Sequence, residues 1–205
     1  MDLPGQHLEP SRPLLSGRDA GSDYYLILRD RLLGDQATSP CLRVVCVVPL
    51  AAEWAVKVRK SAADMTRVDL LVAETSLCES ASPKSVPIHE TRADLSSATA
   101  ARLEAVWLRM LMQTRYAVAP NDVVDAAMYE FAAFDREFGE LNGRTCSAPA
   151  DSRAGRLVAL ADKLRAFVEA PESEQPAIEE DLGKGATERM ATLDEANDSR
   201  RPRRR

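Results

Sequence analysis

Histidines and cysteines are the side chains in this sequence that could bind a metal ion or act as nucleophiles. The chain has two histidines, His7 and His89, and four cysteines. Zinc sites need three or four ligands, commonly in short motifs such as Cys-x-x-Cys. The sequence contains no such motif, and His7 lies in a proline- and glycine-rich N-terminus. We therefore predict no metal site and expect His89 to be a solvated residue at a strand end.

A cysteine paired with His89 is the second kind of chemistry that the sequence offers. Cys46 lies in the middle of an apolar segment, where burial raises the pKa of a thiol and keeps it unreactive. Cys78 and Cys146 fall in segments that have the composition of loops. Structural thiols are therefore the favoured interpretation. A small hydrolase or transferase that uses His89 with a nearby cysteine or carboxylate is the alternative.

Motifs for phosphate or cofactor binding are absent from the sequence. It has neither G-x-G-x-x-G nor a P-loop, and Gly183-Lys184-Gly185 lacks the strand and helix that such a loop connects. Two sets of neighbouring acidic residues could each flank a substrate. The first is Asp122 with Asp125, and the second is Glu130 with Asp135 and Glu137. With 32 acidic residues, such neighbours arise by chance. We assign no catalytic, cofactor-binding or metal-binding residue and expect no cofactor.

Charge is distributed unevenly along the chain. The formal net charge is −5, but five arginines lie within Arg200–Arg205, so the rest of the chain carries −10. An acidic body does not match the phosphates of nucleic acid, and five charges on a tail bind only weakly and in a salt-dependent way. The composition therefore favours another protein as partner and disfavours nucleic acid.

The expected localisation is cytoplasmic. The N-terminus has no apolar segment of the kind that a signal peptide needs. The longest apolar run, residues 44–52, is too short to cross a membrane. Arginine outnumbers lysine and alanine is abundant, a composition that we associate with a bacterial genome rich in G and C.

Short apolar segments in the first half of the chain predict a sheet. Segments rich in valine and leucine, separated by breaks, are typical of an antiparallel meander. The expected strands are Tyr24–Leu28, Leu42–Leu50, Trp54–Arg59, Val68–Thr75 and a short edge strand at Ile88–Arg92. A helical turn within Ala51–Lys60 is the alternative for the third of these. Cys78–Pro87 is expected to be a loop.

Two helices are predicted from apolar residues at helical spacing. The first covers residues 97–116, with Leu103, Val106, Trp107 and Met110 on one face. The second runs from about Ser152 to Ala170 and is ended by Pro171. Both need a common surface on which to bury these faces.

Residues 123–134 have spacing that fits either a helix or a strand. The region around them resembles a family of bacterial proteins of unknown function. The resemblance rests on Trp107, Met110, Leu111, Asp125, Tyr129, Phe131, Gly143, Ser147, Pro149, Leu157, Leu160 and Leu164. Ala126, Cys146 and Ala148 depart from the family's pattern. The resemblance implies a strand at Val123–Phe134. The turn-forming residues Gly139, Asn142-Gly143 and Pro149 predict a loop at Gly139–Pro149.

These elements predict one α+β domain. We expect a mostly antiparallel sheet of four or five strands with two long amphipathic helices on one face, and the other face open to solvent or to a partner. The expected boundaries are a disordered N-terminal segment at 1–21, the domain at 22–171 and a disordered tail at 172–205. The favoured function is that of a non-catalytic, protein-binding accessory protein of the immunity type. The sequence names no substrate, partner or oligomeric state.

Overall fold

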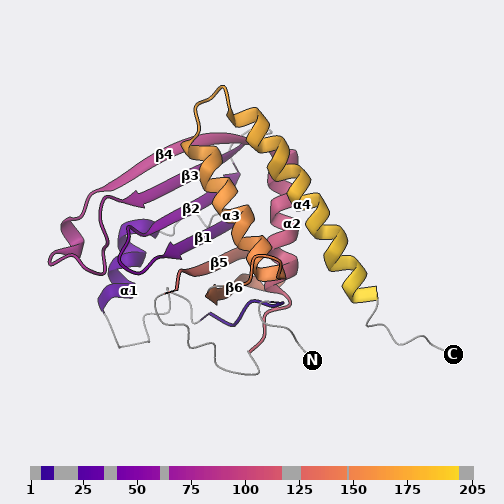
Figure 1. Ribbon diagram of the computed structural model, residues 1–205, viewed down its shortest axis with the longest axis horizontal. Helices are drawn as coiled ribbons and strands as arrows, with labels where there is room; N and C mark the ends of the chain where they lie inside the picture. Colours follow the sequence, from indigo (N-terminus) through magenta and orange to yellow (C-terminus); the bar gives the residue numbers. More distant parts are fainter. Residues whose placement is uncertain are drawn as a thin grey trace.

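A six-stranded antiparallel sheet is the centre of the fold in the computed structural model (Figure 1). The structure describes residues 6–11, 23–34, 41–60, 65–116, 126–146 and 148–198. The strands are β1 (Leu42–Val47), β2 (Trp54–Lys60), β3 (Met65–Ala73), β4 (Ile88–Ser96), β5 (Met128–Asp135) and β6 (Gly139–Cys146). Their order is β4-β3-β2-β1-β5-β6. The α+β class and the antiparallel sheet were predicted, whereas the expected number of strands was four or five.

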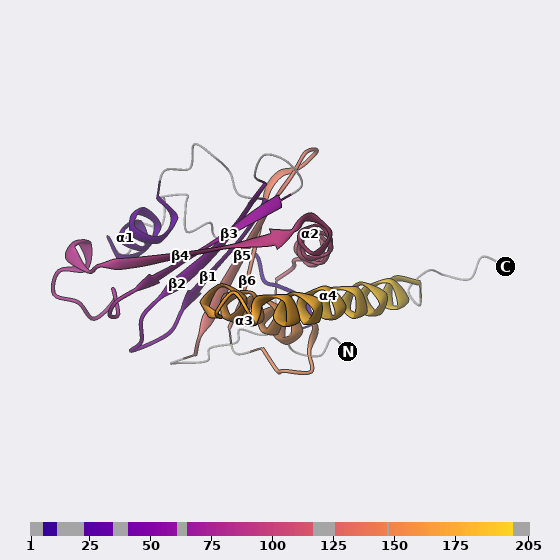
Figure 2. The ribbon, with the colours of Figure 1, turned by 90° about the horizontal axis from the view of Figure 1, so that it is seen from above.

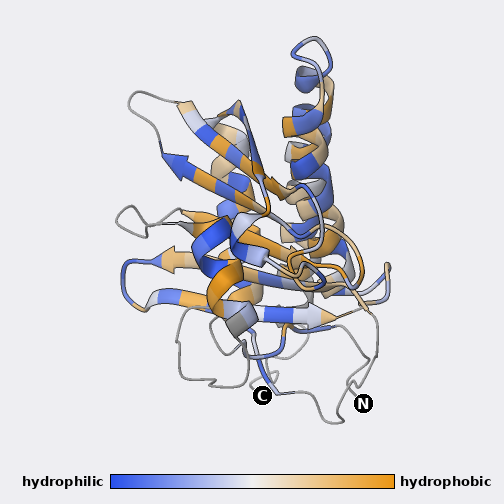
Figure 3. Cartoon of the chain, turned by 90° about the vertical axis from the view of Figure 1, so that its left-hand side faces the viewer, coloured by the Kyte–Doolittle hydropathy of each residue, from blue (hydrophilic) through white to orange (hydrophobic). Residues whose placement is uncertain are grey.

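Strands β1 to β4 form the predicted meander. Each pairs antiparallel with the next, and apolar residues share one face: Val44 is opposite Val56, which is opposite Leu70. Figure 3 shows hydrophobic and hydrophilic residues alternating along the strands, as expected for a sheet whose two faces differ. Ile88–Arg92 was expected to be a short edge strand, and β4 is the longer edge strand at this position.

Strand β5 settles the ambiguity between helix and strand for the part of residues 123–134 that the structure describes. It pairs with β1, so that Phe131 lies opposite Val44 on the same face of the sheet. Residues 123–125 lie outside the described part of the chain. The strand that the family resemblance implied is therefore present from Met128 onward.

Strand β6 corrects the expected loop at Gly139–Pro149. The chain turns at Arg136–Phe138, where the Asp135 carboxylate accepts hydrogen bonds from the amides of Glu137 and Phe138 at 2.8 and 3.0 Å. Gly143 lies within β6 and not at a turn. Because it has no side chain, Leu8 and Thr114 can approach its backbone closely. A Cβ there would lie 3.0 Å from both Leu8 Cβ and Thr114 Oγ1. The prediction of a loop is therefore wrong. Because β6 is an edge strand, it tolerates glycine and polar residues that are otherwise typical of loops.

Helices α2 (Ser97–Leu111) and α3 (Arg153–Glu169) are the two predicted amphipathic helices. The hydroxyl oxygen of Ser96 caps α2 by accepting from Thr99 N, and that of Ser152 caps α3 by accepting from Gly155 N. Both helices pack on the apolar face of the sheet (Figure 1). On that face, Trp107 of α2 contacts Phe131 of β5 edge to face, with ring centroids 5.5 Å apart.

Helix α1 (Asp23–Leu28) corrects the expected strand at Tyr24–Leu28. It continues into a π-helical turn, Arg29–Leu33, and lies on the opposite side of the sheet from α2, α3 and α4 (Figure 2). Leu28, Leu32 and Leu33 form a second apolar cluster there with sheet residues such as Val45. Burial of these leucines against the sheet outweighs the local preference of the sequence for a strand.

Helix α4 (Gln175–Asp198) corrects much of the expected disorder at 172–205. It lies beside α2 and α3 (Figures 1 and 2) and buries Leu182, Ala186 and Leu193 in the main core. At the other end of the chain, the structure also orders part of the segment expected to be disordered at 1–21. Leu8 is fully buried, and the backbone of Glu9 pairs with Arg144 of β6. Residues 1–5, 12–22 and 199–205 lie outside the described part of the chain.

The sheet face away from α2 and α3 was expected to be open. Beside the area that α1 covers, the described residues of this face include a group of charged side chains. The buried carboxylate of Asp69 lies 3.3, 2.7 and 3.6 Å from the Nε atoms of Arg59, Arg67 and Arg92. On the same face, Arg43 lies 3.1 Å from Glu140. Charged side chains therefore occupy much of the described part of this face.

Candidate functional site

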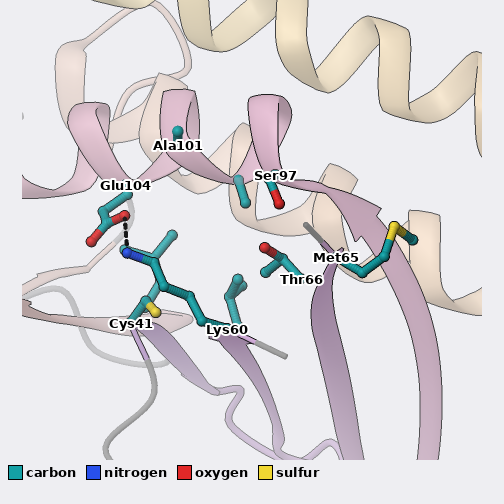
Figure 4. Close-up of a pocket in the computed structure, with 10 residues that line it drawn as sticks. Cys41, Lys60, Met65, Thr66, Ser97, Ala101 and Glu104 are labelled. Atoms are coloured by element: carbon teal, nitrogen blue, oxygen red, sulfur yellow. Dashed lines mark ion pairs between the residues drawn. The ribbon is translucent and has the colours of Figure 1, made fainter. Parts of the chain in front are cut away.

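A cavity of about 340 Å³ lies between the first turns of α2 and the adjoining ends of β1, β2 and β3 (Figure 4). This volume is at the lower end of the range for ligand sites in proteins. The cavity is lined by Cys41, Leu42, Val58, Lys60, Met65, Thr66, Ser97, Ala100, Ala101 and Glu104.

Small side chains at the start of α2 account for the cavity. Ser97, Ala100 and Ala101 face it from the helix, and none of them reaches far toward the sheet. The buried Leu42 and Val58 form the opposite wall from β1 and β2. Protein interiors are closely packed and contain few voids. A space of this size at the edge of the core is therefore unusual, and it is large enough for a small ligand group.

The polar groups of the cavity lie at its rim and along one wall. Lys60 extends from β2 toward α2, and its Nζ lies 3.6 Å from Glu104 Oε2 (Figure 4). Thr66 places a buried hydroxyl group on the wall. Met65 lies on the far side of the cavity from Cys41 and Lys60 (Figure 4), and this residue is 45% exposed. The cavity is therefore amphipathic: apolar walls with a charged pair at one side.

His89 is placed away from this cavity. It lies on the edge strand β4 opposite Val72, it is exposed, and it is not among the residues that line the cavity. The cavity in Figure 4 therefore does not provide a substrate site for a hydrolase that uses His89.

The cysteines of the alternative catalytic interpretation are also separate from the cavity. Cys46 is fully buried on β1, and burial raises the pKa of its thiol to about 12. Cys78 is exposed in the loop after β3, and its amide donates to Glu53 Oε1 at 3.2 Å. Cys146 is half-buried at the end of β6. The cysteine that does line the cavity is Cys41, just before β1.

The remaining sequence candidates are dispersed. Glu130 is buried on β5, whereas Asp135 and Glu137 belong to the β5–β6 turn and its flank. Asp122 and Asp125 lie outside the described residues. Residues 183–185 are a helical stretch of α4, which is not the geometry of a phosphate-binding loop. His7, expected in a loose N-terminus, is half-buried and hydrogen-bonded to Arg115.

Within the described ranges, no three histidine, cysteine, aspartate or glutamate side chains gather closely enough to hold a metal ion. None of the helices described is both long and apolar enough to span a bilayer. Comparison of the chain with protein-family models, with curated proteins and with solved structures gives no match.

Sequence reasoning missed the residues of the cavity. One signal pointed to it: Ser96–Ala101 is a run of small residues at the start of an otherwise bulky helix. Such a run leaves space wherever the helix faces an apolar surface. The partner surface on β1, β2 and β3 could be identified only after the strand register was known.

Proposed function

We propose that this protein is a non-catalytic binding protein, an accessory partner of another protein, and that the cavity under α2 receives a bulky apolar side chain of that partner. The observation that carries the proposal is the amphipathic cavity itself. Leu42, Val58 and Ala100 supply apolar walls, and Lys60 and Glu104 supply a charged rim. Apolar anchors that enter such pockets provide most of the affinity of many protein interfaces.

Exposed apolar side chains at the same end of the sheet support this proposal. Phe134 is 48% exposed, and Phe138, in the β5–β6 turn, is 65% exposed. The amide of Phe134 donates to the carbonyl of Cys41, a cavity residue, at 3.3 Å. Met65 itself lines the cavity and is 45% exposed, and exposed apolar surface at a cavity is a common sign of a binding site.

The ion pair at the rim does not close the cavity. Lys60 is largely exposed, and exposed ion pairs of this kind contribute only about 0–1 kcal/mol to stability. A partner can therefore displace Lys60 from Glu104 at little cost. The hydrolase or transferase alternative has no comparable support, because His89 is exposed on β4 and does not line the cavity.

Peptides selected from a random library on the full chain test the proposal. Ala101→Phe fills the cavity from an exposed position of α2, and Ala105→Phe adds the same ring one turn later, where it does not line the cavity. We expect selected peptides to share a bulky apolar residue, to bind the Ala105→Phe variant normally and to lose at least about ten-fold in affinity for Ala101→Phe. Failure to select any peptide, or equal binding to both variants, would contradict the proposal.

A further inference from the structure

Arg189 is a buried cation within the apolar stripe of α4. Leu182, Ala186, Arg189 and Leu193 follow one another at helical spacing on the buried side of the helix. Arg189 is 4% exposed, whereas the three apolar residues of that stripe are fully buried. Its Nη2 donates to the carbonyl of Ser152 at 3.5 Å, the outer limit for a hydrogen bond, and its Nε is buried without a partner.

No carboxylate of the described residues forms an ion pair with Arg189. The charges that act on it are those of Arg156 and Arg153, both in the first turn of α3, and both repel it. Burial and these two guanidinium groups lower the pKa of Arg189 to about 10. Burying a charged side chain without a counterion costs free energy. A partner of opposite charge with good geometry offsets much of this cost.

The N-terminus of α3 adds to the positive potential at this place. Ser152, whose carbonyl Arg189 contacts, is the N-cap of this 17-residue helix. Helix N-termini carry a partial positive charge and bind anions readily. Arg156 is exposed and Arg153 is half-buried, with its Nη1 3.4 Å from Gln113 Oε1. The Arg189 guanidinium group thus contacts the N-cap carbonyl of α3, and the first turn of this helix carries Arg153 and Arg156.

We propose that this cluster, Arg153, Arg156 and Arg189 at the start of α3, is a binding site for a phosphate-class oxyanion. Arg156 and Arg153 contact the anion from the surface with the charged hydrogen bonds that guanidinium groups form with phosphate. Arg189 adds its charge from beneath and holds the carbonyl of Ser152. A free phosphate ion and a phosphate monoester present the same oxygens to this site. The site is separate from the cavity under α2 and does not depend on its function.

Titration of the full chain with sodium phosphate, against sodium chloride at the same ionic strength, tests this site. We expect saturable shifts in the backbone amide resonances of Gly155 and Arg156 and a rise in the melting temperature with phosphate. A parallel titration with O-phosphoserine distinguishes the two sources: stronger binding of the ester indicates a phosphorylated ligand, and equal or weaker binding indicates free phosphate.

Three variants decide whether the named residues are responsible. Arg156→Gln removes an exposed ligand and should weaken phosphate binding at least about ten-fold. Arg189→Met should abolish the melting-temperature response and raise the melting temperature in chloride, because the uncompensated charge is gone. Lys184→Gln removes an exposed charge of α4 elsewhere and should behave as wild type. Phosphate effects that are absent from the full chain, or unchanged in Arg156→Gln, would overturn the proposal.

Discussion

The phenol oxygen of Tyr24 lies 2.7 Å from Glu53 Oε1, and Glu53 is completely buried. The same carboxylate accepts hydrogen bonds from the amides of Leu77 and Cys78 at 2.8 and 3.2 Å. It therefore links α1 and the loop after β3 to the start of β2. Burial, followed by the neighbouring Glu53 carboxylate, raises the pKa of Tyr24 well above its ordinary value, so that Tyr24 remains a hydrogen-bond donor.

Tyr24→Phe removes the hydroxyl group that Glu53 accepts from. We expect a loss of about 1.5–3 kcal/mol in the free energy of unfolding, the usual range for a hydrogen bond to a charged group. Chemical denaturation of both proteins measures it. Tyr25→Phe is the matched control, because Tyr25 is 42% exposed, and it should change stability little. Equal losses in the two variants would show that the Glu53 contact is not important.

Gly155 and Gly183 are both helical glycines, but they should respond differently to alanine. A Cβ at Gly155 would lie 2.0 Å from the backbone carbonyl oxygen of Pro149, so Gly155→Ala should cost about 1–3 kcal/mol or more through overpacking. At Gly183 the nearest atom is Nη1 of Arg102, 3.0 Å away at the end of a flexible side chain. Gly183→Ala should therefore be neutral or gain up to about 1 kcal/mol from helix propensity. Thermal denaturation compares the two, and the reverse order would refute the described start of α3.

Lys57 should make stability rise with pH in the alkaline range. Burial, and then the charge of Arg59, lower its pKa from 10.5 to about 8, and its Nζ donates to the carbonyl of Leu33 at 2.8 Å. Between these two pH values the unfolded chain binds more protons at Lys57 than the folded chain does. This contribution to stability therefore increases as pH rises from about 8 to 10.5.

Lys57→Met isolates that contribution. Urea denaturation at both ends of the pH window should show a smaller rise, or a larger fall, in stability for the variant than for wild type. Lys60→Met, at a largely exposed lysine of the same strand, is the control for the loss of one positive charge. Identical pH profiles for Lys57→Met and wild type would contradict the burial of a titrating amine.

Cys46 and Cys78 should differ in their reaction with an alkylating agent. Cys78 is exposed, whereas Cys46 is buried with a thiol pKa raised to about 12. Because the thiolate is the reactive form, Cys78 should be modified first and Cys46 only after denaturant is added. Mass spectrometry of peptides follows both residues, and Cys78→Ser confirms the assignment. Early modification of Cys46 in the native protein would indicate that β1 opens easily.

Leu182→Ala tests whether α4 belongs to the domain. Leu182 is fully buried in the main core, so we expect a loss of about 2–5 kcal/mol. The exposed neighbour Lys184 provides the control, and Lys184→Ala should stay within about 0.5 kcal/mol of wild type. A Leu182→Ala variant as stable as this control would indicate that α4 does not pack on the domain and that the predicted disorder of residues 172–205 is correct.

The sequence by itself determined the elements whose burial pattern is local. Leu103, Val106, Trp107 and Met110 mark the buried face of α2, and valine-rich segments mark β1 to β3. Helix caps also act over a few residues, as the hydroxyl oxygen of Ser152 does when it accepts from Gly155 N at the start of α3. Such signals need no knowledge of the rest of the chain.

The tertiary structure alone decided the segments that depend on distant partners. Tyr24–Leu28 becomes helical because the leucines that follow pack on the far side of the sheet, and α4 is ordered because α2 and α3 cover its thin apolar stripe. The cavity under α2 and the unpaired charge of Arg189 are properties of surfaces brought together from several elements. A cavity or a missing counterion depends on several elements that meet in three dimensions. The pattern of residues along one segment therefore cannot reveal either feature.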